Sequence, residues 1–540
     1  MKYLQKLMTN PVSGAIELDE NHIPTEQIFL KLVNSNEVPY ISKPSYIDVT
    51  YDFGDNWDWE DNDGHNIFGE SLWKDSLYAI CIDGVFHDLN TINRMFNFSD
   101  GRQHTVRFYF KYNNHIEDIV ESNINNEDGS VSEYPHISFD FNNFNAQGLI
   151  DINDIFSNSG ITDVYGNLGS WDVSNVTDMS HMFEYAGNVH NIKSINKWDV
   201  SNVTDMSYMF AAKEDRTKEN RTKLKLNNWD VHNVTDMNHM FSGCEYLTTV
   251  GNLSGWDVSS VEDMSYMFAD CYNLTTVGNL SGWNASACTD MSYMFYNCSD
   301  LTSIGNLSGW SIETCTTIEN MFAGCESLTT LDLSGIGVLL DHVSGICYDC
   351  HNLTSANFSD LPSVNVTNMD SMFENCYSLS ALNLRNWDVS NVTDMNNMFY
   401  DCRSLSALNL ENWNTTVNAD LMFYNCSGLT NLNIDELKFT SVDSTFDGCT
   451  SLIGIDLAPG FDQTNDTNTY FDFSDCPWMK GSLLDSLVTN QEGEEINGTK
   501  IVLSDYSISQ LDSEEIQSIE EMGFEIYTKD NGNYIKYTNI

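Results

Sequence analysis

Positive charge is scarce in this chain of 540 residues: 24 lysines and arginines stand against 79 aspartates and glutamates, which gives a formal net charge of −55. A chain this acidic repels the phosphates of nucleic acids and of anionic membranes, so neither is expected as a partner. No apolar run approaches the roughly 20 residues that cross a bilayer, so membrane insertion is not expected either. We therefore expect a partner with a neutral or basic surface.

Motifs of catalysis are also missing. The 12 histidines show no zinc-site spacing, no glycine-rich phosphate loop follows a strand, and no Gly-x-Ser-x-Gly elbow occurs. Carboxylates are so abundant that a pair with suitable spacing carries no information. The stretch from Met1 to Pro11 has neither a continuous apolar core nor a small-residue cleavage site, so it predicts no secretory signal. We predict a protein that is not an enzyme and binds no cofactor.

What the chain has in abundance is one repeat. The string Trp-Asp-Val-Ser-Asn-Val-Thr-Asp-Met-Ser-x-Met-Phe occupies 171–183 and 198–210, and it returns with changes as far as the 470s. A period of 23–31 residues predicts a solenoid of about 13 turns, in which each unit buries its apolar face against its neighbours. The phenylalanine column of the repeat reads Phe156, Phe183, Phe210, Phe241, Phe268, Phe295, Phe322, Cys347, Phe373, Phe399, Phe423, Phe446 and Phe473.

Within a repeat, the spacing predicts a short helix followed by a short strand. Met291, Met294 and Phe295 lie one helical turn apart and would share one helix face. The later pattern Cys402-x-x-Leu405-x-x-Leu408-x-Leu410 ends with the alternation of a strand. Most of the 14 cysteines share the column of Cys402, where cysteine acts as a small buried hydrophobe. We expect these thiols to be free, because stacked side chains point in parallel and disfavour bridging.

The full unit, Phe-x-x-Cys-x-x-Leu-x-x-Leu-x-Leu followed by Trp-Asp-Val-Ser-Asn-Val-Thr-Asp-Met, resembles the BspA-like leucine-rich repeat family of surface proteins. This resemblance covers 146–476 and implies an α/β leucine-rich-repeat solenoid that acts in recognition or adhesion. The segment 477–540 predicts a small α/β cap, with helices near 482–488 and 513–522 and strands at 500–503 and 524–527. Its order of elements is similar to C-terminal segments of leucine-rich proteins encoded by bacteriophages and prophages.

The region before the repeat predicts two further parts. Residues 1–45 would be an extended attachment segment, and 46–145 a β-rich, sandwich-like domain with strands at 46–53 and 104–112. With the missing secretory signal, the phage resemblance predicts a virion component, a fibre or decoration protein on the virion surface. The alternative is an adhesin on a bacterial cell surface. In both cases 1–145 would dock to the parent assembly, and the solenoid would contact protein or glycan on a host. A homo-oligomer is left open.

Two sets of repeated positions are candidates for an interaction surface. One column would form an outer ridge of amphipathic rings that suits an interface, unless neighbouring rings simply cover one another. It comprises His181, Tyr208, His239, Tyr266 and Tyr293. Polar strand positions would line the concave face and suit hydrogen bonding to glycan or protein, although a plain solenoid shows the same polarity. These are Thr249, Thr276, Thr330, Asn409 and Asn433.

Acidic residues raise the question of calcium. Two aspartate columns, which begin at Asp172 and Asp178 and continue at Asp199 and Asp205, either accept backbone N–H groups at turns or form a calcium ladder. The stretch 55–70 matches several positions of a calcium loop, but Trp59 stands at its first position. Its other interpretations are a solvated turn with one buried tryptophan, or the site of a carbohydrate-active enzyme built on Trp57 and Trp59.

Overall fold

The computed structural model describes most of the repeat and the larger part of the C-terminal region. The described residues are 46–52, 65–66, 77–87, 95–96, 103–110, 136–142, 144, 149, 152–157, 161–186, 188–189, 192–212, 223–305, 307, 310–334, 336, 340–359, 365–464, 469–476, 480–488 and 498–538. The predicted attachment segment 1–45 and the loop with Trp57 and Trp59 lie outside them. The chain forms two compact units, Met1–Val250 and Gly251–Ile540, each of which is treated by itself.

A seven-stranded sheet forms part of the first unit. Its strand order is β4-β3-β6-β1-β7-β8-β9. β1 pairs antiparallel with β6 and β7, whereas β7, β8 and β9 are parallel to one another. The strand pairing therefore changes from antiparallel to parallel at β7, and the sheet contains strands from both sides of residue 145. The strands are β1 (Tyr46–Asp52), β3 (Leu77–Ile82), β4 (Val85–His87), β6 (Gln103–Phe110), β7 (His136–Asp140), β8 (Ile161–Tyr165) and β9 (Asn188–Val189), with a separate pair β2 (His65–Asn66) and β5 (Met95–Phe96).

The first unit also contains the first solenoid turns, marked by the phenylalanine column. The rings of Phe156, Phe183, Phe210 and Phe241 stack at centroid distances of 5.2, 5.5 and 5.4 Å. Each of these side chains is fully buried. Two short 3-10 helices, η1 (Leu168–Ser170) and η2 (Ile192–Lys197), precede the tryptophans of successive turns. The indole N–H of Trp198 donates to the Leu168 carbonyl of the preceding turn at 2.7 Å, and that of Trp229 donates to the Ile195 carbonyl at 3.0 Å.

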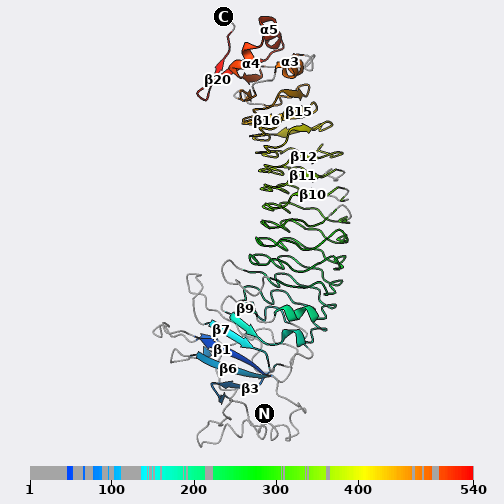
Figure 1. Ribbon diagram of the computed structural model, residues 1–540, viewed down its shortest axis with the longest axis vertical. Helices are drawn as coiled ribbons and strands as arrows, with labels where there is room; N and C mark the ends of the chain where they lie inside the picture. The colour runs from blue at the N-terminus through cyan, green and yellow to red at the C-terminus, as the bar shows by residue number, and fades with distance from the viewer. Residues whose placement is uncertain are drawn as a thin grey trace, which may run out of the picture. The chain divides into compact units, whose positions relative to one another are not determined.

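The second unit continues as stacked turns whose short strands are parallel and in register (Figure 1). This confirms the predicted leucine-rich-repeat solenoid. Three sheets are formed, with orders β10-β11-β12, β13-β15-β17 and β14-β16, and single bridges link other turns. The strands are β10 (Thr330–Asp332), β11 (Ser355–Asn357), β12 (Ala381–Asn383), β13 (Ala407–Asn409), β14 (Thr416–Asn418), β15 (Asn431–Ile434), β16 (Lys438–Ser441) and β17 (Gly454–Leu457).

Phenylalanine and cysteine columns form the core of the second unit. The rings of Phe268, Phe295 and Phe322 stack at 5.4 and 5.6 Å. Beside them, Cys298 Sγ donates to the Phe268 carbonyl at 3.2 Å, and later cysteines repeat this contact. All 14 cysteines are free and buried, as the column predicts. Burial raises the pKa of the Cys449 thiol to about 12, so this thiol is neutral at physiological pH.

The predicted short helix in each repeat is wrong: in its place the chain makes consecutive turns. In a helix every N–H would point to the carbonyl four residues back. Here the N–H groups of Met291 and Phe295 instead donate to the next turn of the solenoid, to Thr317 at 3.1 Å and Met321 at 2.9 Å. The residue between the two methionines, Tyr293, has a left-handed φ of 58°. Bonding between turns therefore overrides the local helical spacing.

The C-terminal region forms the predicted α/β cap. A four-stranded sheet has the order β18-β19-β20-β21, and its first strand carries Phe473, the last residue of the phenylalanine column. The helix predicted near 513–522 is present as the last helix, and Asp512 and Glu515 form a capping box at its start. The elements are β18 (Tyr470–Phe473), α3 (Lys480–Val488), β19 (Lys500–Leu503), α4 (Asp505–Ser509), α5 (Ser513–Glu521), β20 (Glu525–Asp530) and β21 (Asn533–Lys536).

Candidate functional site

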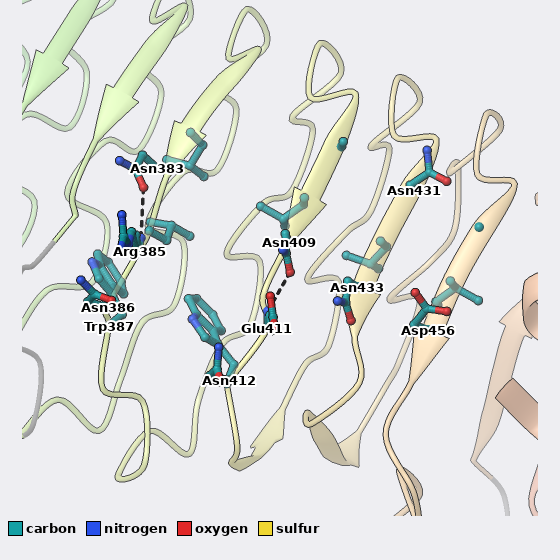
Figure 2. A pocket seen from close by; sticks show the side chains of 18 residues that line it. Asn383, Arg385, Asn386, Trp387, Asn409, Glu411, Asn412, Asn431, Asn433 and Asp456 are labelled. Carbon is teal, nitrogen blue, oxygen red and sulfur yellow. Dashed lines mark hydrogen bonds between the residues drawn. The ribbon is translucent and has the colours of Figure 1, made fainter. Parts of the chain in front are cut away.

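A polar groove of about 1060 Å³ lies over four strands of the second unit, β12, β13, β15 and β17 (Figure 2). The small residues Ala407 and Gly454 are among those that line it. Asn409 and Asn433, two of the predicted surface residues, line it, and Asp456 follows them in register on β17. One side chain on each of three neighbouring strands therefore faces the same space.

The asparagine carbonyls of the groove are occupied by the turns that follow the strands. Oδ1 of Asn383 accepts the Arg385 N–H at 3.2 Å, and Oδ1 of Asn409 accepts the Glu411 N–H at 2.9 Å (Figure 2). Oδ1 of Asn433 likewise accepts a backbone N–H, two residues on, at 3.2 Å. This contact holds each side chain in one orientation. It uses only the amide oxygen, so the amide nitrogen can donate to another group.

Those amide nitrogens are paired in one sheet and unpaired in the next. Asn383 Nδ2 donates to Asn357 Oδ1 at 2.9 Å, and Asn357 Nδ2 donates to Asp332 Oδ1 at 3.1 Å. In the described part of the chain, Nδ2 of Asn409 and Nδ2 of Asn433 have no such acceptor. Two oriented amide donors about 4.8 Å apart therefore face the groove with their hydrogen-bonding capacity unused.

The groove spans a break in the strand ladder. β10, β11 and β12 form one sheet, β13, β15 and β17 form another, and the described strands β12 and β13 do not pair. At the break Leu382 is half-buried, whereas Leu408, at the same strand position one turn later, is only 6% exposed. The interrupted ladder explains why the chain of side-chain amides ends at Asn383.

Charge and aromatic groups are distributed unevenly in the groove. Arg385 and Glu411 are exposed at equivalent places after their strands, and Asp456 adds a second carboxylate. Trp387 and Trp413 also line the groove, but they are 6% and 3% exposed and stack on each other at 6.1 Å. Their ring faces are therefore committed to the core, and the groove offers hydrogen bonds and charge to a ligand.

The predicted polar strand residues do not all lie together. Thr330 is exposed on β10, in the sheet that ends at β12. Thr276 is exposed and bridges to Ser303, earlier in the second unit. Thr249 belongs to the first unit, where it bridges to Lys223. Only the two asparagines of the predicted set line the groove.

The predicted aromatic ridge is a continuous stack of rings within each unit. His181, Tyr208 and His239 stack at 4.8 and 4.4 Å with nearly parallel planes, and Tyr266 stacks on Tyr293 at 4.6 Å. All five are half-buried and have left-handed φ angles near 55°. Their faces cover one another, which favours the alternative that the column serves to hold successive turns together.

The aspartate columns act as turn caps. Oδ1 of Asp178 accepts both the backbone N–H and the hydroxyl of Ser180, at 2.8 and 2.7 Å. The Ser201 hydroxyl and backbone N–H hold the pKa of Asp199 below its usual value in the same way. The carboxylates that were candidates for a calcium ladder are thus engaged by their own turns, so the interpretation as backbone acceptors accounts for them.

Elsewhere in the second unit, crowded acids should make stability depend on pH. Burial and then the carboxylates of Asp349, Asp370 and Asp401 raise the pKa of Glu374, and burial also raises the pKa of Asp370. Because the folded pKa lies above the unfolded value, the folded state binds more protons, and its stability rises as the pH falls through the folded pKa. The contribution is complete below the unfolded pKa.

We therefore expect a higher thermal midpoint at pH 5 than at pH 8, and a weaker dependence in Glu374→Gln. Differential scanning calorimetry across this range measures both. Glu262→Gln, at an exposed carboxylate, removes the same charge and serves as the control. Equal pH profiles for Glu374→Gln and the wild-type protein would contradict the assignment.

Sequence reasoning missed Arg385, Glu411 and Asp456 as groove residues. A signal for them was available, since Asp456 stands at the strand position of Asn433 and Glu411 follows Asn409 by two residues. The position of Arg385 follows in the same way from Asn383. What the repeat pattern does not contain is the break between β12 and β13, which makes this stretch of the concave face a groove.

Comparison with known proteins gives a family but no curated relative. No curated protein matches the chain. Similar solved structures include a leucine-rich cell surface protein from Faecalibacterium prausnitzii A2-165, with 16% identity over 56% of this chain and 81% of that chain, at a TM-score of 0.25. A leucine-rich repeat protein from Eubacterium ventriosum ATCC 27560 has 15% identity over 49% of this chain and 82% of that chain, at a TM-score of 0.22.

A third similar structure is a leucine-rich repeat protein of Leptospira interrogans, with 12% identity, coverage of 71% of this chain and 95% of that chain, and a TM-score of 0.18. Within the described residues, no helix combines the length and apolarity needed to cross a membrane. One family model matches three stretches, 93–223, 214–334 and 342–453, which together make up well over half of the chain. The chain therefore belongs to the family described as Mycoplasma protein of unknown function, DUF285.

Proposed function

We propose that the protein is a non-enzymatic recognition or adhesion protein whose groove over β12, β13, β15 and β17 binds a hydroxyl-rich ligand, a glycan chain on a cell surface. The observation that carries this proposal is the pair of oriented amide donors, Nδ2 of Asn409 and Nδ2 of Asn433, which have no partner in the described chain. A sugar hydroxyl accepts from an amide N–H and donates to a carboxylate, so Asp456 in the same row completes the match.

The lining of the groove favours binding over catalysis. Among the described residues that line the groove there is no serine, cysteine, histidine or lysine, so the usual nucleophiles and nitrogen bases are missing from its wall. Its carboxylates are Glu411 and Asp456, of which the second lies in one row with the asparagines. The absence of catalysis is tested by analysing the glycan recovered from the complex, whose chain length is expected to be unaltered.

The spacing of the donors favours a glycan over an extended peptide. Neighbouring strands place Asn409 and Asn433 about 4.8 Å apart, whereas an extended peptide repeats its groups on one face about every 6.6 Å. The polar groups of a peptide that ran across the strands would therefore not stay aligned with the amide donors. Sugar rings present hydroxyl groups around their whole edge, so they can meet donors at the shorter spacing.

The test uses the full chain, labelled and applied to a glycan array and to a peptide array of matched size. The double variant Asn409→Asp/Asn433→Asp removes both amide donors but keeps the Oδ1 acceptor of each turn, and aspartate is native at this strand position in Asp332 and Asp456. We expect apparent glycan affinity to fall about tenfold or more, at about 1 kcal/mol for each lost bond.

The matched control is Asn252→Asp/Asn279→Asp. Both residues are exposed and accept a backbone N–H two residues on, at 3.1 and 3.0 Å, but neither lines the groove. The control adds the same charge, so it separates a local effect from a general one. Binding to peptides alone, or unchanged glycan binding by the groove variant, contradicts the proposal.

The place of display is a second part of the proposal. We infer that the protein stands on the exterior of a particle, either a bacterial cell or a virion, with residues 1–145 on the side of the parent assembly. The high negative charge of the chain would keep neighbouring copies apart and leave the groove accessible. Antibody labelling of intact cells and of purified virions distinguishes the two particles, and protein found only inside cells contradicts both.

A further inference from the structure

Three side chains of the first unit, Asp154, His181 and Glu184, each place one ligand atom within 4.8 Å of the other two. His181 Nδ1 lies 2.8 Å from Glu184 Oε2. Asp154 belongs to the preceding turn, where its N–H bonds to the Ser180 carbonyl at 3.1 Å. We propose that these residues bind one divalent transition-metal ion of the zinc class, which clamps the first turn of the solenoid to the second. This site is independent of the proposed groove function.

The cluster arises because one position of the repeat changes its residue type. Asp154 precedes Phe156 by two residues, as His181 precedes Phe183 and Tyr208 precedes Phe210. Asp154 therefore lies at the end of the ring column, where a carboxylate stands in place of another ring. Both Asp154 and His181 have left-handed φ angles, 54° and 56°, so the fold of the turn brings the two side chains together.

Neighbouring groups orient two of the three side chains. The His181 ring stacks on Tyr208 at 4.8 Å with an interplanar angle of 8°, which fixes the plane of the imidazole. The Ser157 hydroxyl donates to Asp154 Oδ1 at 2.8 Å. Such contacts around ligands reduce the rearrangement needed to bind a metal. A small closure of the side chains would bring all three atoms to the roughly 2.0–2.2 Å that zinc requires.

The donor set indicates the class of ion. One imidazole nitrogen with two carboxylate oxygens suits zinc and its neighbours, whereas calcium and magnesium prefer oxygen ligands only. The two carboxylates offset the charge of a divalent cation, and the chain as a whole attracts cations. Three protein ligands leave a position for water or for a group from a bound partner.

Another histidine of the described chain shows why this cluster is distinctive. His351 also lies between two carboxylates, but Glu326 faces its Nδ1 at 3.8 Å and Asp349 faces its Nε2 at 3.7 Å. Opposite ring nitrogens cannot share one ion. In the Asp154 cluster one ligand atom of each side chain lies within 4.8 Å of the other two, so the three can share one ion.

The experiment is zinc titration of the full chain by calorimetry, in 150 mM NaCl with excess magnesium and calcium to occupy non-specific carboxylates. His181→Phe removes the ligand and keeps a ring on Tyr208. His239→Phe is the matched control, because His239 stacks on the other face of Tyr208 at 4.4 Å. Around His239 the repeat has Tyr208 where His181 has Asp154, and Ser242 where His181 has Glu184, so His239 has no carboxylate at either position. Asp154→Asn, at an exposed residue, is a second variant that leaves the stack intact.

We expect one zinc site for each chain, with affinity reduced about tenfold or more in His181→Phe and in Asp154→Asn and unchanged in His239→Phe. Hydrogen exchange of residues 152–186 should slow when zinc is bound, since the ion links two turns. Absence of a competition-resistant site, or equal zinc affinity in His181→Phe and the wild-type protein, overturns the proposal.

Discussion

Replacement of Phe295 by alanine is expected to lower the free energy of unfolding by about 3–5 kcal/mol. The Phe295 ring is fully buried between Phe268 and Phe322, at 5.4 and 5.6 Å with interplanar angles of 5° and 6°. Its removal leaves a cavity between the two flanking rings, which a close-packed core closes only in part. Urea unfolding of the full chain, followed by tryptophan fluorescence, measures the change.

The loss should be concentrated near the substitution, since each turn contacts only its neighbours. Hydrogen exchange is therefore expected to quicken in the turns of Phe268, Phe295 and Phe322 and to change little in α5. Asp300→Ala is the control, because Asp300 is exposed in the same turn and surface changes of this kind stay within about 0.5 kcal/mol. Equal effects of the two substitutions would show that the phenylalanine column is not the core.

Cys347 shows that the column tolerates a smaller residue only with local adjustment. It occupies the place of a phenylalanine and is fully buried. In the same repeat, Phe358 packs edge-on against Phe373 of the following turn at 5.4 Å, which brings an additional ring into this part of the core. A single Phe295→Ala substitution has no such neighbour to compensate, so the natural cysteine does not argue against a large effect.

The solenoid could be predicted because its cause is repeated in the sequence. The spacing of Phe183, Phe210 and Phe241 fixes the length of one turn, and a column of identical apolar residues leaves no alternative to stacking. The helix predicted from Met291, Met294 and Phe295 failed for a different reason. Whether an N–H bonds within its own turn or to the next one depends on how turns are placed, and one repeat read alone does not contain this information.

The candidate site, like the solenoid, could be predicted from the sequence only in part. Strand alternation placed Asn409 and Asn433 on the concave face, because it depends only on the residues of one strand. The free amide donor of Asn409 depends on contacts between strands, because β12 and β13 do not pair and the row of amide bonds ends with the bond from Asn383 to Asn357. The metal cluster in the first unit likewise needed the stacking of Asp154 under His181, which lies 27 residues away in the chain.

Loss of one charge in the C-terminal cap is expected to have the second large effect. The Asp472 side chain on β18 is only 6% exposed, and it accepts from Lys529 Nζ at 2.7 Å and from the Tyr534 hydroxyl at 3.1 Å. Burial, and then the Asp472 carboxylate, raise the pKa of Tyr534 to about 12. The tyrosine is therefore a neutral donor at physiological pH, and Lys529 is the cation closest to this carboxylate.

Lys529→Met should cost about 3 kcal/mol in urea unfolding, because it leaves a buried carboxylate without its cation. The double variant Asp472→Asn/Lys529→Met should recover more than half of this loss, since asparagine removes the charge and still accepts from Tyr534 and from the Ser474 N–H, which lies 2.9 Å from Oδ1. Lys536→Met is the control, because that lysine pairs with Glu525 at 2.8 Å in a more exposed place. If Lys529→Met and Lys536→Met cost the same, the ion pair of Asp472 is not what fastens the cap to the last turn.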